Sequence, residues 1–228
     1  MRYETPAPPA ELGEADGLAY SLWLPEGDPR GGVVILHGAG SCKESHHDFA
    51  RAARAAGLAA VCFDQRGHGA SPGALDGRVL DDIAAMARRL GDVPLALRGS
   101  SMGGYLAILA AERVGARAVV AICPASSDGL WRALRSGELD FPADVPAVEA
   151  FLAEHPLDAA VERLPIPLLL MHAEGDERVP VAHSRELARR SPAPATRLVV
   201  VPGGHHRSVQ HDAELQGHAL RWLRGVMG

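Results

Sequence analysis

The amino-acid sequence predicts an α/β protein in which helices cover both faces of a doubly wound, mostly parallel sheet. Two observations lead to this fold class. Short apolar runs alternate along the chain with longer segments whose apolar residues recur at helical spacing. The runs are apolar on both faces, which is typical of central strands in a parallel sheet covered by helices. Their alternation with helical segments implies right-handed strand–helix–strand crossovers.

The apolar runs are the expected strands, and each is too short for a stable helix. The run VVIL, for example, stops at His37-Gly38. In chain order, the expected strands are residues 18–24, 33–36, 59–63, 95–97, 118–122, 168–171 and 198–201.

The segments between these runs are expected to be helices. Residues 43–56 end at Gly57, a residue type that favours the left-handed backbone after a helix. Residues 79–90 place their apolar side chains on one face, and residues 103–114 are apolar all round, which predicts a buried helix. Two more helices are expected over residues 183–190 and 209–226.

Residues 124–164 break this alternation because they contain no expected strand. The segment holds several large apolar residues and is interrupted by Pro142, Pro146 and Pro156. Crossovers elsewhere in the chain are far shorter. We therefore expect a single domain over residues 1–228, with 124–164 as a small helical cap over the edge of the sheet. An ordinary crossover with a long connection is the alternative.

Composition excludes several classes of function. The net charge of −5 and the pI of about 6.1 argue against a nucleic-acid partner, which needs a basic face. No apolar stretch approaches the ~20 residues that span a bilayer, so no membrane partner is expected. The N-terminus carries acids and prolines where a signal peptide has an apolar run. We expect a soluble, cytoplasmic protein, and the oligomeric state is left open.

Cysteine and histidine usage argues against a metal site. Cys42, Cys62 and Cys123 are far apart and form no C-x-x-C pair, which favours a reducing compartment. The histidines at 46 and 47 and those at 205, 206 and 211 come without an acid cluster, so they are weak evidence for a metal site. No metal and no cofactor are expected.

The strongest motif is Gly99-Ser100-Ser101-Met102-Gly103, a G-x-S-x-G directly between an expected strand and an expected helix. Such a junction needs a sharp, strained turn that exposes the central serine. The hydroxyl then lies at a helix N-terminus, where free N–H groups favour negative charge. We predict that Ser101 is a catalytic nucleophile.

A serine hydroxyl needs a base, and the imidazole of that base needs a carboxylate. His205 and His206 follow the last expected strand, so both are candidates for the base. The preceding strand runs into HAEGDERVP. There Asp176 follows a glycine in a tight turn, and we favour it as the acid over Glu174, Glu177 and Asp128.

Acyl transfer also needs donors for the oxyanion. The backbone N–H of Met102 follows the nucleophile, and the glycine-rich loop after residues 33–36 offers the N–H of Ala39. In the expected cap, Trp131 and Phe141 are candidates to line a substrate pocket. Packing within the cap would explain these two aromatic residues equally well.

These motifs together resemble the α/β-hydrolase superfamily, in particular small bacterial serine hydrolases of the dienelactone-hydrolase-like and serine-aminopeptidase-like branches. The matching stretches are HGAGSCKES (37–45), FDQRGHGASPG (63–73), RGSSMGGY (98–105), HAEGDERVP (172–180) and VPGGHHRS (201–208). The resemblance implies the nucleophile–acid–base order Ser101, Asp176, His206. The last loop of such proteins usually reads P-G-x-x-H, which selects His206 over His205. The turn at residues 64–71 is similar to a structural turn of the family.

The resemblance implies an esterase of the α/β-hydrolase fold that cleaves carboxylic esters through an acyl-enzyme. The small size of the expected cap favours small or short-chain acyl groups. Dienelactone hydrolases carry a cysteine where this chain has Ser101, so their substrate is not expected here. A thioesterase, an amidase or an acyltransferase would use the same three residues. A non-catalytic receptor that keeps the fold is the alternative from another class.

Overall fold

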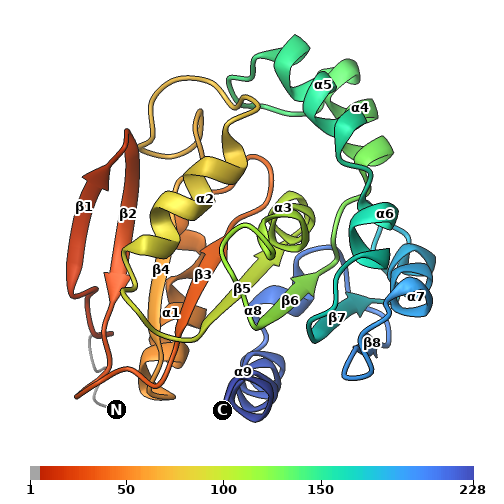
Figure 1. Ribbon diagram of the computed structural model, residues 1–228. Coiled ribbons are helices and arrows are strands. Elements are labelled where there is room, and N and C mark those ends of the chain that lie inside the picture. The colour runs from red at the N-terminus through yellow and green to blue at the C-terminus, as the bar shows by residue number, and fades with distance from the viewer. Residues whose placement is uncertain (1–5) are drawn as a thin grey trace, which may run out of the picture.

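A computed structural model describes residues 6–228 of the chain, and a single sheet runs through it (Figure 1). The strand order is β1-β2-β4-β3-β5-β6-β7-β8. The strands β3 to β8 pair in parallel, whereas β1 and β2 are antiparallel to their neighbours. The strands are β1 (Glu11–Ala15), β2 (Leu18–Trp23), β3 (Gly32–Leu36), β4 (Ala59–Phe63), β5 (Leu95–Ser100), β6 (Ala118–Ile122), β7 (Leu168–Ala173) and β8 (Arg197–Val201). The doubly wound α/β fold expected from the sequence is confirmed.

Helices cover both faces of the sheet (Figure 1). Alternate residues of a strand enter opposite cores: Val34 and Leu36 pack with α2, α3 and α7, while Val33 and Ile35 pack with α1 and α9. The helices on these layers are α1 (His47–Ala55), α2 (Val79–Arg88), α3 (Met102–Ala110), α7 (Val181–Arg190), α8 (Ser208–His211) and α9 (Ala213–Met227). Burial of both strand faces explains why the runs lack apolar–polar alternation.

Three helices lie in the segment 124–164: α4 (Ser127–Ser136), α5 (Val145–Glu154) and α6 (Leu157–Glu162). Helices α4 and α5 pack against each other and stand out beyond the sheet (Figure 1). Helix α6 instead packs against α3 and α7, so it is part of the helix layer. A parallel bridge between Leu75 and Ala143 ties the segment to the loop before α2.

Three further elements differ from the sequence expectation in their existence or continuity. The strand β1 was not expected, because its sequence ELGEA contains no apolar run. It joins β2 through Asp16 and Gly17, which both have positive φ. A 3₁₀ helix, η1 (Lys43–His46), precedes α1 where one helix over 43–56 was expected. The expected helix over 209–226 is broken at Asp212, whose carboxylate caps the N-terminus of α9.

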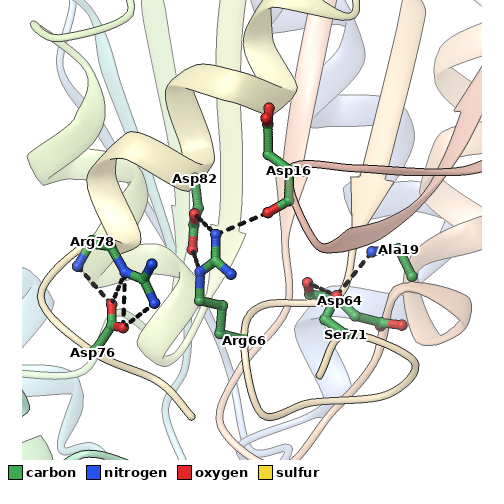
Figure 2. Close-up of polar contacts among 8 residues, drawn as sticks. All are labelled: Asp16, Ala19, Asp64, Arg66, Ser71, Asp76, Arg78 and Asp82. Carbon is green, nitrogen blue, oxygen red and sulfur yellow. Dashed lines mark hydrogen bonds and ion pairs between the residues drawn. The ribbon is translucent and has the colours of Figure 1, made fainter. Parts of the chain in front are cut away.

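The loop after β4 is held by buried polar groups (Figure 2). The Ser71 hydroxyl donates to the Asp64 carbonyl at 2.6 Å and accepts from the Ala19 N–H at 2.9 Å. The Arg66 guanidinium donates two hydrogen bonds to Asp82 of α2, at 2.8 and 2.9 Å, and a third to the Asp16 carbonyl. These bonds tie the loop to the β1–β2 hairpin and to α2, which gives the turn at 64–71 a structural role.

Candidate active site

Ser101 lies at the abrupt junction between β5 and α3. Its backbone has φ 54° and ψ −119°, a strained conformation for a residue other than glycine. A Cβ at Gly103 would lie 2.3 Å from the Leu36 carbonyl oxygen, and one at Gly99 would lie 2.0 Å from the Gly103 carbonyl oxygen. Both glycines of the motif are therefore required by close backbone contacts around the turn. The neighbouring Ser100 hydroxyl is buried.

Asp176 and His206 meet at the carboxyl ends of β7 and β8. His206 donates from Nδ1 to Asp176 Oδ2 over 2.7 Å. The loops that carry them are joined by a backbone hydrogen bond from the Gly175 N–H to the Gly203 carbonyl, at 2.8 Å. A Cβ at Gly175 would lie only 2.6 Å from the Gly204 carbonyl oxygen, so the close approach of the two loops needs glycine there.

The Asp176 carboxylate is held by several donors besides His206. The N–H groups of Arg178 and Val179 each donate to Oδ1 at 2.9 Å, and His172 Nε2 lies 3.2 Å from Oδ2. Burial by itself would raise the pKa of Asp176, but hydrogen bonds from His172, His206 and these N–H groups outweigh it and hold the pKa well below its usual range. Asp176 is therefore a fixed anion.

His172 is a site residue that the sequence analysis missed. It is the penultimate residue of β7 and is fully buried. The imidazole bonds to the Ser184 hydroxyl at 2.7 Å and to the Val179 carbonyl at 2.9 Å, while it faces Asp176. Its position four residues before Asp176 was the feature of the sequence that could have indicated a contact with that carboxylate.

The other candidates for acid and base have different partners. The His205 ring is exposed, and its Nδ1 accepts from the Arg207 N–H at 3.3 Å. Glu177 accepts the backbone N–H of His206 at 3.0 Å, which positions that loop. Glu174 is exposed and lies 3.5 Å from the Arg185 guanidinium. Within the described residues, none of these three contacts Asp176 in the way that His206 does.

Ser101 and His206 line the same open groove, together with residues 38–41. Among residues 6–228, however, no hydrogen bond joins the Ser101 hydroxyl to the His206 ring. The Nδ1–H of His206 is committed to Asp176, so its Nε2 is left as the acceptor for a proton. A change of the serine rotamer or of the histidine loop is therefore needed to form that bond, as is common in ligand-free sites.

The predicted oxyanion donors flank the nucleophile. A Cβ at Gly38 would lie 3.2 Å from the Ser101 Cβ, so the loop over residues 37–41 runs directly against the serine. Ala39 lies in that loop and Met102 is the first residue of α3. Across the described part of the chain, neither N–H has a hydrogen-bond partner. Both donors are thus available to a bound group.

Buried polar contacts hold this loop at both ends. At its start, the Gln65 N–H donates to His37 Nε2 at 3.0 Å, and burial lowers the pKa of His37 to about 4. After its end, Lys43 donates to Asp64 twice, from its backbone N–H at 2.6 Å and from Nζ at 2.8 Å. Burial would lower the pKa of Lys43, but its bonds to Asp64 and Glu44 raise it.

Two aromatic residues of the segment 124–164 lie in different places. Phe141 lines an apolar pocket of about 30 Å³ beneath α4 and α5, which Met102 and Tyr105 also line. The Phe141 ring packs on that of His68 at 4.0 Å between centroids. Trp131 lines the open groove, is 41% exposed, and has the Arg135 guanidinium 4.9 Å from its ring centre.

Cys123 is a second strained residue beside the site, with φ 44° at the end of β6. Its sulfur, a carboxylate oxygen of Asp176 and a ring nitrogen of His206 lie within 4.8 Å of one another. These residue types can bind a metal such as zinc. Burial raises the pKa of the Cys123 thiol, which keeps it protonated and makes it a poor ligand, and the Asp176–His206 bond already occupies the other two groups.

Comparison with known proteins identifies the family. Residues 27–136 match the family described as serine aminopeptidase, S33. The monoacylglycerol lipase of Mycolicibacterium smegmatis is 30% identical over 241 residues, which cover 83% of this chain and 85% of that protein. This protein belongs to the α/β-hydrolase superfamily. Human monoglyceride lipase is 35% identical to this α/β-hydrolase over 116 residues, which cover 46% of the chain and 38% of the human protein.

Solved structures agree with this α/β-hydrolase in fold. The monoacylglycerol lipase of Paleococcus ferrophilus superposes with a TM-score of 0.75 at 21% identity, covering 91% of this chain and 98% of that one. Est1E from Butyrivibrio proteoclasticus, solved with ferulic acid bound, gives a TM-score of 0.73 at 22% identity and covers 95% and 99% of the two chains. Over residues 6–228 of this α/β-hydrolase, no helix is long and apolar enough to cross a bilayer.

Proposed function

We propose that this α/β-hydrolase cleaves carboxylic esters of small or short-chain acyl groups through an acyl-enzyme on Ser101. The observation that carries the proposal is the 2.7 Å bond from His206 Nδ1 to Asp176 Oδ2 beside the strained Ser101 turn. It fixes the imidazole with Nε2 free to accept a proton. The relatives named as monoacylglycerol and monoglyceride lipases support an ester substrate.

In the proposed mechanism, the Ser101 hydroxyl attacks the ester carbonyl while His206 Nε2 takes its proton. The imidazolium that forms is stabilised by Asp176, whose lowered pKa keeps the carboxylate ionised throughout. His206 then gives the proton to the departing alcohol. Water attacks the acyl-enzyme by the same route and releases the acid, with no cofactor required.

The negative charge of the tetrahedral intermediate is assigned to the N–H groups of Ala39 and Met102. Each lacks a partner in the described residues, and both lie next to Ser101. Met102 also begins α3, so the helix dipole adds to the stabilisation of the oxyanion. A donor of this kind contributes about 3 kcal/mol to transition-state binding.

The two hollows beside Ser101 suggest how an ester is oriented. The apolar pocket beneath α4 and α5 suits a short acyl group, since its volume of about 30 Å³ leaves no room for a long chain. The open, mixed-polarity groove lined by Trp131 suits the alcohol portion. Phe141 on the pocket wall and Trp131 on the groove are then the substrate-contacting aromatic residues.

The test is a panel of substrates with the wild-type protein and Ser101→Ala. We expect p-nitrophenyl acetate and butyrate to be cleaved faster than the palmitate, acyl-CoAs or aminoacyl amides. Ser101→Ala should lose roughly 10⁴-fold in kcat/KM. A fluorophosphonate should label the wild type on Ser101 and leave the variant unlabelled. Faster cleavage of thioesters or amides would change the substrate class, and an unlabelled, inactive wild type would favour a ligand receptor.

A further inference from the structure

Arg98 is a fully buried cation that the proposed mechanism does not use. It lies in β5, directly before Gly99 of the nucleophile motif, and is 0% exposed. Among residues 6–228, no carboxylate forms an ion pair with it. The guanidinium bonds instead to neutral acceptors: Nη1 donates to His46 Nδ1 at 2.7 Å, and Nη2 donates to the Gln210 carbonyl at 3.0 Å. The central carbon of the guanidinium, Cζ, lies over the Phe49 ring, 4.8 Å from the ring centre.

Such an arrangement is costly for the fold. Removing a charge from water costs several kcal/mol, and neutral acceptors repay only part of this. The Arg98 Nε is also buried with no hydrogen-bond partner. Stability alone would therefore favour an apolar side chain at this position.

The two acceptors explain what Arg98 achieves. His46 ends η1, the short helix that follows the proposed oxyanion loop over residues 37–41. Gln210 lies in α8, four residues after His206. The Arg98 guanidinium thus bonds to η1, which follows the proposed oxyanion loop, and to α8, which follows the His206 loop.

Further bonds stiffen both segments behind Arg98. The Gln210 carbonyl also accepts from Gln216 Nε2 at 3.0 Å, and the Gln210 amide contacts His211 Nε2 at 2.8 Å. His211 and Gln216 both bond to Asp48 Oδ2, at 2.9 and 2.8 Å. Arg98 is therefore bonded to a hydrogen-bond network that joins α1, α8 and α9.

We propose that Arg98 is a positioning residue that sets the oxyanion loop and the His206 loop relative to Ser101. The inference rests on the proposed esterase function. It predicts that the bonds of Arg98 affect the chemical step much more than substrate binding. It also requires an acceptor on His46, since the Nδ1 atom that faces Nη1 must be unprotonated.

The first test compares Arg98→Met with Arg66→Met. Both variants remove a guanidinium, but Arg66 bonds to Asp82 and the Asp16 carbonyl, away from the site. With p-nitrophenyl acetate, Arg98→Met should lose ~10- to 100-fold in kcat, since misplacement by about 1 Å costs that much, while KM changes less than about twofold. Arg66→Met should lower the melting temperature and leave kcat of the folded protein near wild type. Equal kcat in folded Arg98→Met and wild type would overturn the proposal.

A second pair keeps the test decisive if Arg98→Met does not fold. His46→Asn keeps an acceptor near the Nδ1 position, and His46→Leu removes it. We expect His46→Asn to stay within about threefold of wild-type kcat and His46→Leu to lose ~10-fold or more. Equal values for the two variants would contradict the role of the Arg98–His46 bond.

Hydrogen exchange separates this inference from the proposed function. In Arg98→Met or His46→Leu, backbone amides of residues 39–46 and 206–211 should exchange faster than in Arg66→Met. An inactive, unlabelled wild type would refute the esterase proposal, whereas unchanged exchange in these loops would refute the positioning role by itself.

Discussion

At the residue scale, the two adjacent histidines after β8 differ in their hydrogen bonds, and we expect their substitution to have different effects on activity. His206 bonds to Asp176, whereas within residues 6–228 the exposed His205 ring hydrogen-bonds only to the Arg207 N–H of its own loop. His206→Ala should lose roughly 10⁴-fold in kcat/KM because the proposed triad acts as a unit. His205→Ala should stay within a fewfold of wild type. Steady-state kinetics on a p-nitrophenyl ester measures both, with circular dichroism as the control for folding.

The reverse ranking of the two variants would move the proposed base by one residue. Reasoning from the residues alone left both histidines open, because neighbours in a loop share one position relative to the sheet. The spacing P-G-x-x-H favoured His206 through resemblance. The backbone of the glycines at 203 and 204, with φ 63° and 73°, sets which ring turns inward, and a sequence does not display that geometry.

At the element scale, η1 depends on a buried ion pair. Lys43, the only lysine in the chain, has a side chain 9% exposed and bonds to Asp64, whose side chain is 0% exposed. Lys43→Met leaves that carboxylate buried without its cation, which should cost about 3–5 kcal/mol in the free energy of unfolding. Glu44→Gln removes the other, exposed partner of Lys43 and should cost less than about 1 kcal/mol. Urea denaturation at neutral pH measures both.

Equal losses of unfolding free energy in the two variants would show that the buried Lys43–Asp64 bond stabilises the fold no more than the exposed Lys43–Glu44 pair does. This pair also marks a limit of sequence analysis at the element scale. Strands β3 to β8 were expected because each is apolar on both faces, but the break between η1 and α1 was not. That break comes with the bonds of Lys43 to Asp64, which lies 21 residues away in the chain. The strand β1 was also missed, because it has no apolar run. The turn residues Asp16-Gly17 were the signal in the sequence for its hairpin with β2.

At the scale of the whole molecule, buried neutral histidines link stability to pH. Burial lowers the pKa of His37 to about 4, and burial followed by the Arg98 charge lowers that of His46 well below its usual value. An unfolded histidine has a pKa near 6.5. Between about pH 6.5 and 4 the unfolded chain therefore binds more protons than the folded chain. Stability should fall as the pH drops through this window, and below it Asp176, whose pKa is lowered, continues the loss.

The variant His37→Gln isolates one of these groups. His37 is held neutral by the Gln65 N–H at Nε2 and by the Gly38 carbonyl, 2.8 Å from Nδ1, and a protonated ring could not keep the first bond. Losing this titration should reduce the slope of unfolding free energy between pH 5 and 6 by about 1.2 kcal/mol per pH unit, slightly less than the value for one full proton. His218→Gln, at an exposed position in α9, should keep the wild-type slope. Urea titrations at several pH values supply the slopes. If His37→Gln keeps the full wild-type slope, protonation of His37 is not what the fold resists at acid pH, and the burial of the oxyanion loop would have to be reconsidered.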